Sequence, residues 1–199
     1  MEESKNLRLE SKKKELEELQ KELDLLIDKE RRVYDRNEER EISHKINQVF
    51  CEIDRVRSEI HLLENNPVAS NETIDIYLEE GSIEEESAYF GIYLHGTSTR
   101  IGRVSLRGDF YRSLGNIGYG LDEEYRGHRF MLQSLELLKE TMIRMKIYKP
   151  VITVEPNNEP SIHTIQNFGG VLIQPHDGKK IWYDTYEVDL MADETPKKK

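Results

Sequence analysis

The sequence is poor in several features that mark particular classes of protein. Its 199 residues include a single cysteine, Cys51, which excludes an internal disulfide framework and suits a reducing compartment. No apolar stretch approaches the roughly 18 residues that a membrane-spanning helix needs. The start, residues 1–5, also lacks the apolar core of a signal peptide. We therefore expect a cytoplasmic protein that is not embedded in a membrane.

Positive charge is also scarce. The chain has 29 Lys and Arg against 39 Asp and Glu, a net charge of -10, which argues against nucleic acid as a partner. The 6 histidines show no metal-ligand spacing with Asp, Glu or Cys, so we predict no metal site. With 36% hydrophobic residues, a chain of this length can form one sizeable domain plus an extension.

Residues 1–64 contain no Gly or Pro and are dense in Glu, Lys and Arg. Two sets of apolar residues follow heptad a and d spacing: Leu16, Leu19, Leu23, Leu26 and Val33, then Ile42, Ile46, Val49, Ile53, Val56, Ile60 and Leu63. The two sets are out of phase, which predicts a helical hairpin with a turn near residues 35–38. Asp35 and Glu38 have capping-box spacing for its second helix. One long helix with a phase break is the alternative.

Either arrangement leaves narrow apolar seams that need a partner. They can pack on each other, on the downstream domain, on a protein partner or on a second copy of the chain through residues 1–65. The stretch Ser43-His44-Lys45-Ile46-Asn47 weakly resembles the Ser-x-x-Leu-Asp motif of two-helix phosphatases that act on the sporulation response regulator. Asn47 stands where that family has its functional Asp.

Downstream of the helical region the pattern changes to short strands. Asn65-Asn66-Pro67 ends the helices, and we divide the chain into a hairpin (1–65), a linker (66–72), a domain (73–191) and a disordered tail (192–199). Strands are predicted at 73–78, 88–95, 100–107, 116–121 and 151–155, with a loop at 110–114, and a hairpin pairs 171–173 with 181–190. A helix follows residue 130, because Met131, Leu135, Leu138, Met142 and Met145 recur at helical spacing.

The stretch Tyr125 to Met131 joins a predicted strand to that helix. The first N–H groups of a helix lack partners and lie at the positive end of its dipole, so this position can bind a phosphate group. Gly127 allows the backbone to approach an anion closely.

Residues 72–190 resemble the GNAT superfamily of acyl-CoA-dependent N-acetyltransferases. Arg126 to Met131 lies over its acetyl-CoA motif, Arg/Gln-x-x-Gly-x-Gly/Ala, and Asn158, Ser161 and Gly169 match its Asn-x-x-Ser/Ala motif before a helix that ends in Gly. Two residues depart from the pattern, since Arg129 replaces the usual Gly and Met131 replaces Gly or Ala. Family members also place two helices between their first two strands, where this chain has room for about one turn.

The resemblance implies an α+β fold: a mixed, mainly antiparallel sheet with two splayed parallel strands and flanking helices, preceded here by the helical hairpin. It implies acetyl-CoA as co-substrate and an amine as acceptor. The residues it assigns to acetyl-CoA binding are Leu121, Arg126, Gly127, His128, Arg129, Phe130, Met131, Asn158 and Ser161. Attack by the amine is direct in this family, so no nucleophilic side chain is required.

The sequence identifies the general acid and base of the reaction less clearly than the residues that bind acetyl-CoA. Many family members place a proton-donating Tyr in the helix after the Asn motif, and the matching residue here is Ile165. Tyr183 or Tyr186 can take that role, and Glu155, at the end of a strand, is the candidate base. The sequence thus predicts an N-acetyltransferase. The alternative is a non-catalytic regulatory protein with a partner-binding hairpin and a degenerate acyl-CoA-binding domain.

Overall fold

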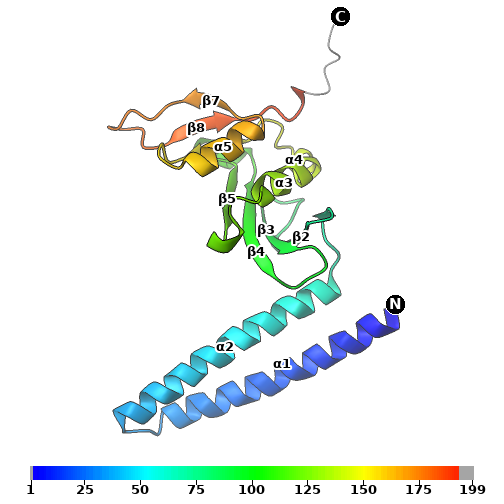
Figure 1. The fold of residues 1–199 in the computed structure, drawn as a ribbon, viewed down its shortest axis with the longest axis vertical. Helices are drawn as coiled ribbons and strands as arrows, with labels where there is room; N and C mark the ends of the chain where they lie inside the picture. Colours follow the sequence, from blue (N-terminus) through cyan, green and yellow to red (C-terminus); the bar gives the residue numbers. More distant parts are fainter. Residues whose placement is uncertain (1, 193–199) are drawn as a thin grey trace, which may run out of the picture. The chain divides into compact units, whose positions relative to one another are not determined.

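The computed structural model describes residues 2–192 and divides the chain into two compact units, residues 1–66 and residues 67–199 (Figure 1). The tail predicted at 192–199 lies outside the described residues apart from Ala192.

The first unit is a helical hairpin, as the phase of the apolar residues predicts. Helix α1 spans Glu2–Glu30 and helix α2 spans Arg36–Glu64. Asp35 caps α2, because its carboxylate accepts hydrogen bonds from the N–H groups of Asn37 at 2.9 Å and Glu38 at 3.0 Å. The turn therefore falls where the sequence predicts it, and the single long helix is excluded.

The two helices of the hairpin pack on each other along one seam. On α2 the buried residues are Ile42, Ile46, Val49, Ile53 and Val56, which repeat at heptad spacing. Ion pairs across the helices flank this seam, including Lys12 with Glu59 at 2.7 Å and Lys29 with Glu38 at 3.1 Å. Of the packing partners that the sequence left open, each apolar seam therefore packs against the other helix of the hairpin.

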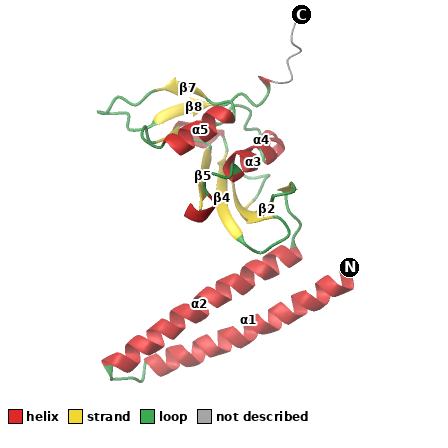
Figure 2. Ribbon diagram, in the orientation of Figure 1, coloured by secondary structure: helices red, strands yellow, loops and turns green. Residues whose placement is uncertain are grey.

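The second unit begins with a five-stranded antiparallel sheet in the order β1-β2-β3-β4-β5 (Figure 2). Its strands are β1 (Ala69–Ser70), β2 (Ile74–Gly81), β3 (Ser87–Leu94), β4 (Arg100–Arg107) and β5 (Ile117–Leu121). Strand β1 lies within the segment expected to be a linker. Only residues 82–86 join β2 to β3, so the described chain has no helices at that point.

A second, three-stranded sheet has the order β6-β8-β7. Strand β6 spans Val151–Val154, β7 spans Val171–Gln174 and β8 spans Asp184–Glu187, and both pairs are antiparallel. These strands confirm the predicted strand near 151–155 and the predicted hairpin after residue 170.

Three α-helices complete the unit: α3 (Phe130–Leu137), α4 (Lys139–Arg144) and α5 (Glu159–Asn167). The single helix predicted after residue 130 is wrong in one respect, because the backbone turns at Leu138, where ψ is 0°, and divides it into α3 and α4. The predicted loop at 110–114 is a 3₁₀ helix, η1 (Asp109–Leu114), and another, η2 (Glu123–Tyr125), precedes α3.

A continuous core joins the sheets and helices of this unit. It includes Ile74, Phe90 and Leu106 from the five-stranded sheet, and Leu135 and Ile165 from the helices, each fully buried. Helix α3 contacts β2 and β5, and α5 contacts β6 and α3. The fold is thus mixed α+β, with two N-terminal helices, a five-stranded antiparallel sheet, further helices and a second small sheet.

Candidate acyl-CoA site

The segment between β5 and α3 makes a tight turn with two residues in the left-handed region. After Leu121, the N–H of Asp122 donates to the carbonyl of Ile101 at 3.0 Å, and η2 follows. Gly127 then has φ +82°, and Arg129 has φ 61° and ψ 12°. A side chain built at Gly127 would meet nothing within 4 Å, so the backbone at this position is open to a ligand.

Helix α3 begins without a side-chain cap. The N–H of Gln133 makes the first intrahelical bond, to the carbonyl of Arg129 at 3.0 Å, and no side chain of the described residues caps the helix before it. The N–H groups of Phe130, Met131 and Leu132 therefore precede that first bond. Such groups, at the positive end of a helix dipole, are suited to bind an anion such as a phosphate.

The two departures from the family motif leave this arrangement in place. Arg129 adopts the left-handed conformation for which the family's Gly is suited, although this conformation costs a residue with a side chain about 1–2 kcal/mol. Met131 is 6% exposed and belongs to the hydrophobic core. Its side chain therefore packs inward and does not occupy the turn.

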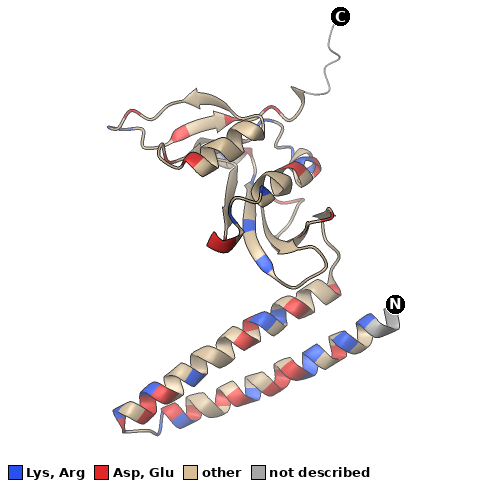
Figure 3. Ribbon diagram, viewed as in Figure 1, with Lys and Arg blue, Asp and Glu red and all other residues tan. Residues whose placement is uncertain are grey.

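Charged residues of both signs lie along the segment between β5 and α3 (Figure 3). The Nε of Arg126 donates to the carbonyl of Leu121 at 3.2 Å. His128 stacks on Phe130 with the ring centroids 5.6 Å apart. The guanidinium of Arg129 is exposed and makes no hydrogen bond or ion pair to any residue that the structure describes, so it is free to pair with an anion.

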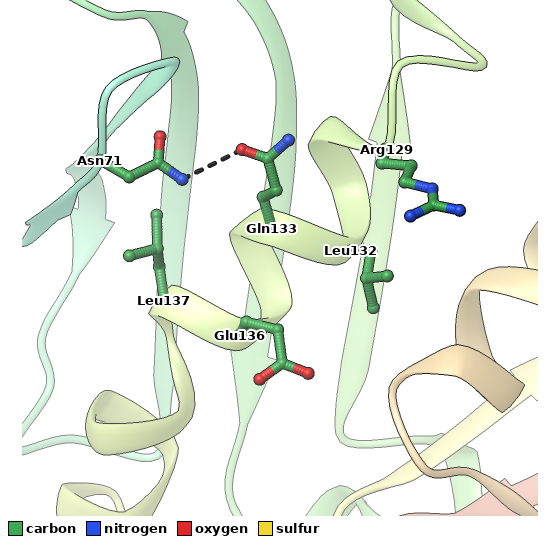
Figure 4. A pocket seen from close by; sticks show the side chains of 6 residues that line it. All are labelled: Asn71, Arg129, Leu132, Gln133, Glu136 and Leu137. Carbon is green, nitrogen blue, oxygen red and sulfur yellow. Dashed lines mark hydrogen bonds between the residues drawn. The ribbon is translucent and has the colours of Figure 1, made fainter.

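A surface pocket of about 490 Å³ runs along the exposed face of α3 (Figure 4). Asn71, Arg129, Leu132, Gln133, Glu136 and Leu137 line it. The side-chain amide of Asn71 donates to Gln133 at 3.0 Å, which ties the segment before β2 to the helix. The pocket thus continues from the turn along the apolar side chains of α3.

Asn116 marks the point where the two sheets separate. Its backbone N–H donates to the carbonyl of Val151 at 2.7 Å, and its side-chain oxygen accepts from the N–H of Val151 at 2.9 Å. Beyond this link the two strands belong to different sheets, and within the described chain no ladder joins β5 to β6. One edge of β5, from Ile117 to Leu121, therefore has no strand paired with it.

Tyr119 links β5 to the start of α5. Its hydroxyl lies 2.7 Å from the hydroxyl of Ser161 in the first turn of α5. Burial raises the pKa of the Tyr119 phenol, and the hydrogen bond with Ser161 offsets this only in part, so the phenol stays protonated at neutral pH. Sequence reasoning missed this residue. Its Asn-Ile-Gly-Tyr context was the only available signal, because a tyrosine in a strand ordinarily packs.

The Asn motif caps the helix that follows β6. Asn158 is the N-cap of α5, and its side-chain oxygen accepts from the N–H of Ser161 at 3.3 Å. Ser161 therefore serves both the cap and the bridge to Tyr119. The structure thus brings the predicted residues of both motifs to the helix starts that follow β5 and β6.

The candidate acid and base residues differ in exposure. Glu155 directly follows β6, is exposed and makes no hydrogen bond or ion pair from its carboxylate to the described residues. Tyr183 is 50% exposed, whereas Tyr186 is 5% exposed and belongs to the core. Ile165, where many family members have Tyr, is fully buried, and His163 is exposed on α5.

Three further properties of the described residues concern a metal site, a cysteine nucleophile and a membrane span. No group of three His, Cys, Asp or Glu side chains in this part of the chain could hold a metal ion. Cys51 is a free thiol on α2, in the other unit. None of the described helices is both long and apolar enough to cross a bilayer.

One family model matches the chain. The model of the acetyltransferase (GNAT) domain matches residues 46–171, which is more than half of the chain. No curated protein matches the sequence. Similar solved structures include an acetyltransferase from Agrobacterium tumefaciens, with 19% identity, a TM-score of 0.44, and 51% of this chain and 60% of that one covered.

Two further solved structures are acetyltransferases of ribosomal proteins. The enzyme from Salmonella typhimurium that modifies the N-terminal serine of protein L7/L12 has 21% identity and a TM-score of 0.44, with 52% of this chain and 64% of that one covered. The S5-alanine acetyltransferase from Vibrio fischeri has 21% identity and a TM-score of 0.42, with coverages of 56% and 65%. The chain spans less than two thirds of each of the three structures. By the domain match, this chain belongs to the GNAT acetyltransferase family.

Proposed function

We propose that the protein is an N-acetyltransferase, in which an acceptor amine attacks acetyl-CoA directly in a ternary complex. The observation that carries the proposal is the start of α3, where Gly127 is open and Arg129 holds the left-handed conformation despite its side chain. Strained backbone conformations of this kind cluster at ligand-binding sites, which supports the proposal.

The residues of the turn fit a pyrophosphate group. The N–H groups of residues 130–132 supply donors that no side chain of the described residues uses. The free guanidinium of Arg129 adds a charged, fork-shaped donor beside them. These groups hold the co-substrate by its anionic part and leave its acyl end to the separated strands.

The unpaired edge of β5 supplies the next contacts. Its backbone groups near Leu121 are placed to pair with the amide groups of the co-substrate, although the carbonyl of Leu121 already accepts from Arg126. Asn158 and Ser161 line the facing start of α5, where the side-chain nitrogen of Asn158 remains available. Bound acetyl-CoA supplies a thioester whose carbonyl carbon the amine attacks.

Two proton transfers complete the proposed reaction. Glu155 is the proposed base, because its exposed carboxylate at the end of β6 has no partner among the described residues. Tyr183 is the better of the two candidate acids, since its phenol is half exposed. Tyr186 would have to leave the core to reach a substrate.

The proposal is tested by thiol release from acetyl-CoA with a panel of amines, and by thermal unfolding with and without acetyl-CoA. At about 100 times its dissociation constant, the ligand adds about 2.7 kcal/mol, a shift of roughly 5–10 °C for a chain of this size. Gly127→Trp should abolish both signals. Gly178→Trp is the matched control, because Gly178 also has a positive φ, +67°, and open space around it, but lies in the β7–β8 turn. Equal loss in both variants would contradict the proposal.

A second candidate function rests on Ile165. Its full burial leaves α5 without the proton donor that many relatives place there, which favours a regulatory protein that binds partners through the hairpin. In that case no amine releases thiol, and deleting residues 1–66 abolishes capture of the partner. Thiol release with any amine decides against this second function.

A further inference from the structure

The strand β4 presents a basic face on the side of the sheet away from the core. Its residues Ile101, Val104 and Leu106 are buried in the core, whereas Arg103, Ser105 and Arg107 lie on the opposite side. The basic residues of β4 are visible in Figure 3. We name this surface the β4 face, and it consists of Tyr89, Arg103, Ser105, Arg107, Gly118 and Gly120.

The register of the sheet places Arg103 between two glycines. Arg103 pairs with Gly91 on β3 and with Gly120 on β5. A side chain built at Gly120 would meet nothing within 4 Å, so bare backbone adjoins the arginine. Ser105 pairs with Tyr89, which is 43% exposed, and with Gly118. The surface is therefore open on the β5 side of Arg103, whereas the side chains of Glu79 and Tyr93 fill the space above Gly91 on the β3 side.

The guanidinium groups of Arg103 and Arg107 have no ion-pair partner among the described residues. Elsewhere in the unit, Arg100 pairs with Glu79 at 2.7 Å and Arg112 pairs with Glu187. Neither Arg103 nor Arg107 makes a side-chain hydrogen bond or ion pair with any residue that the structure describes.

The guanidinium of Arg107 has an unsatisfied hydrogen-bond donor. Its guanidinium lies over the ring of Tyr111, 5.8 Å from the centroid, and its Nε atom is buried without a hydrogen-bond partner among the described residues. Because the Nε atom is enclosed by protein, an acceptor on the surface meets this guanidinium through its terminal nitrogens. A carboxylate suits a guanidinium best, because both are planar and form paired hydrogen bonds.

The spacing of the two arginines indicates the shape of the ligand. Arg103 and Arg107 are four residues apart on one strand, which places their Cα atoms about 13 Å apart at 3.3 Å per residue. An extended peptide has the same rise, and its residues i and i+4 lie on the same side. Two carboxylates separated by four positions can therefore meet both arginines.

We propose that the β4 face binds an extended acidic peptide segment, and that this segment belongs to the acceptor whose amine is acetylated. The inference rests on the proposed acetyltransferase function and names its substrate class, an acidic polypeptide. The face adjoins β5, which leads directly into the turn before α3. A nucleic acid is the less suitable ligand, because the net charge of -10 repels a polyphosphate over a long range.

The test measures peptide binding by fluorescence anisotropy, with the full-length protein and no acetyl-CoA. The probe is a labelled 12-residue peptide with two Glu residues four positions apart in a Ser/Ala background, and the same peptide with Gln is its control. Arg103→Gln and Arg107→Gln should each weaken binding about tenfold, as expected for one charged hydrogen bond of ~1.5 kcal/mol. Arg144→Gln, the same change on exposed α4, should stay within about twofold.

Each other outcome overturns the inference. Equal binding of the Glu and Gln peptides removes the carboxylates as the recognised groups. Tighter binding of a 12-nucleotide single-stranded RNA assigns the face to nucleic acid. Absence of peptide binding up to about 1 mM, together with thiol release from small amines, rejects this inference and leaves the proposed function standing. Arginine-dependent binding without thiol release from any amine removes the acceptor role. Circular dichroism of Arg107→Gln checks that the variant is folded.

Discussion

Replacing Arg129 by Gly and, separately, by Ala distinguishes the backbone strain of the turn from the charge of the side chain. Arg129 has φ 61° and ψ 12°, a conformation that costs a residue with a Cβ about 1–2 kcal/mol. Glycine removes this strain but adds about 0.4–1 kcal/mol of unfolded-state entropy. Without ligand, Arg129→Gly should therefore raise the free energy of unfolding by about 0.5 kcal/mol. Arg129→Ala should leave it unchanged, because alanine keeps the strain.

The two variants should behave alike once acetyl-CoA is added. Both lose a guanidinium that has no partner in the described protein and is free to pair with a phosphate. A hydrogen bond from a charged group contributes about 1.5–3 kcal/mol, so both variants should bind acetyl-CoA at least about tenfold more weakly. Calorimetric titration measures this affinity, and thermal unfolding without ligand measures the strain, with an expected difference of about 2 °C between the variants.

Two results would refute this reasoning. If Arg129→Gly binds acetyl-CoA as tightly as the unchanged protein, the guanidinium does not contact the phosphates. If the Gly and Ala variants unfold at the same temperature, the left-handed conformation is not a cost to this turn. Repeating the titration at higher salt is a further check, because a charge pairing weakens as salt rises.

Three further substitutions test hydrogen bonds that stabilise the fold. Asn116→Ala removes three hydrogen bonds that join Arg107, Gly108 and Val151, and should cost about 3 kcal/mol in urea unfolding, whereas the exposed Asn157→Ala should cost less than about 0.5 kcal/mol. Hydrogen bonds from His176 hold the pKa of Asp184 below its usual value, so this carboxylate stabilises the fold above about pH 4 and the effect is lost as pH falls through the folded pKa. Asp184→Asn should therefore flatten the stability profile between neutral and acidic pH. Asp35→Ala removes the cap of α2 and should cost about 1 kcal/mol, measured as loss of helical circular dichroism on heating.

The sequence predicted the elements whose signals are local. Heptad phase and the capping residue Asp35 determine the hairpin, because both act within a few turns of helix. The hairpin between β3 and β4 follows from alternation around Gly96, which has φ +68° in the structure. The break at Leu138 escaped prediction, since no Gly or Pro marks it and apolar spacing continues through it.

The candidate site was predictable only in part, for a physical reason. Residues 126–131 and Asn158 are marked by turn and cap chemistry, which depends on neighbouring residues. Tyr119 and Ser161 are 42 residues apart and meet only when β5 and α5 come together. Likewise, the sequence could not show that Met131 packs into the core while Arg129 takes the left-handed turn, because both depend on how α3 lies on the sheet.

The separation of the two sheets at Asn116 accounts for the position of the site. The side chain of Asn116 bonds the N–H of Val151, so this backbone donor is satisfied without a ladder between β5 and β6. Strand β6 pairs with β8 instead, and β5 is left with one free edge. Helices α3 and α5 follow these two strands and contact each other, and Ser161 at the start of α5 meets Tyr119 of β5. A single buried amide thus leaves one edge of β5 unpaired, next to the turn and the α3 start at which the proposed site lies.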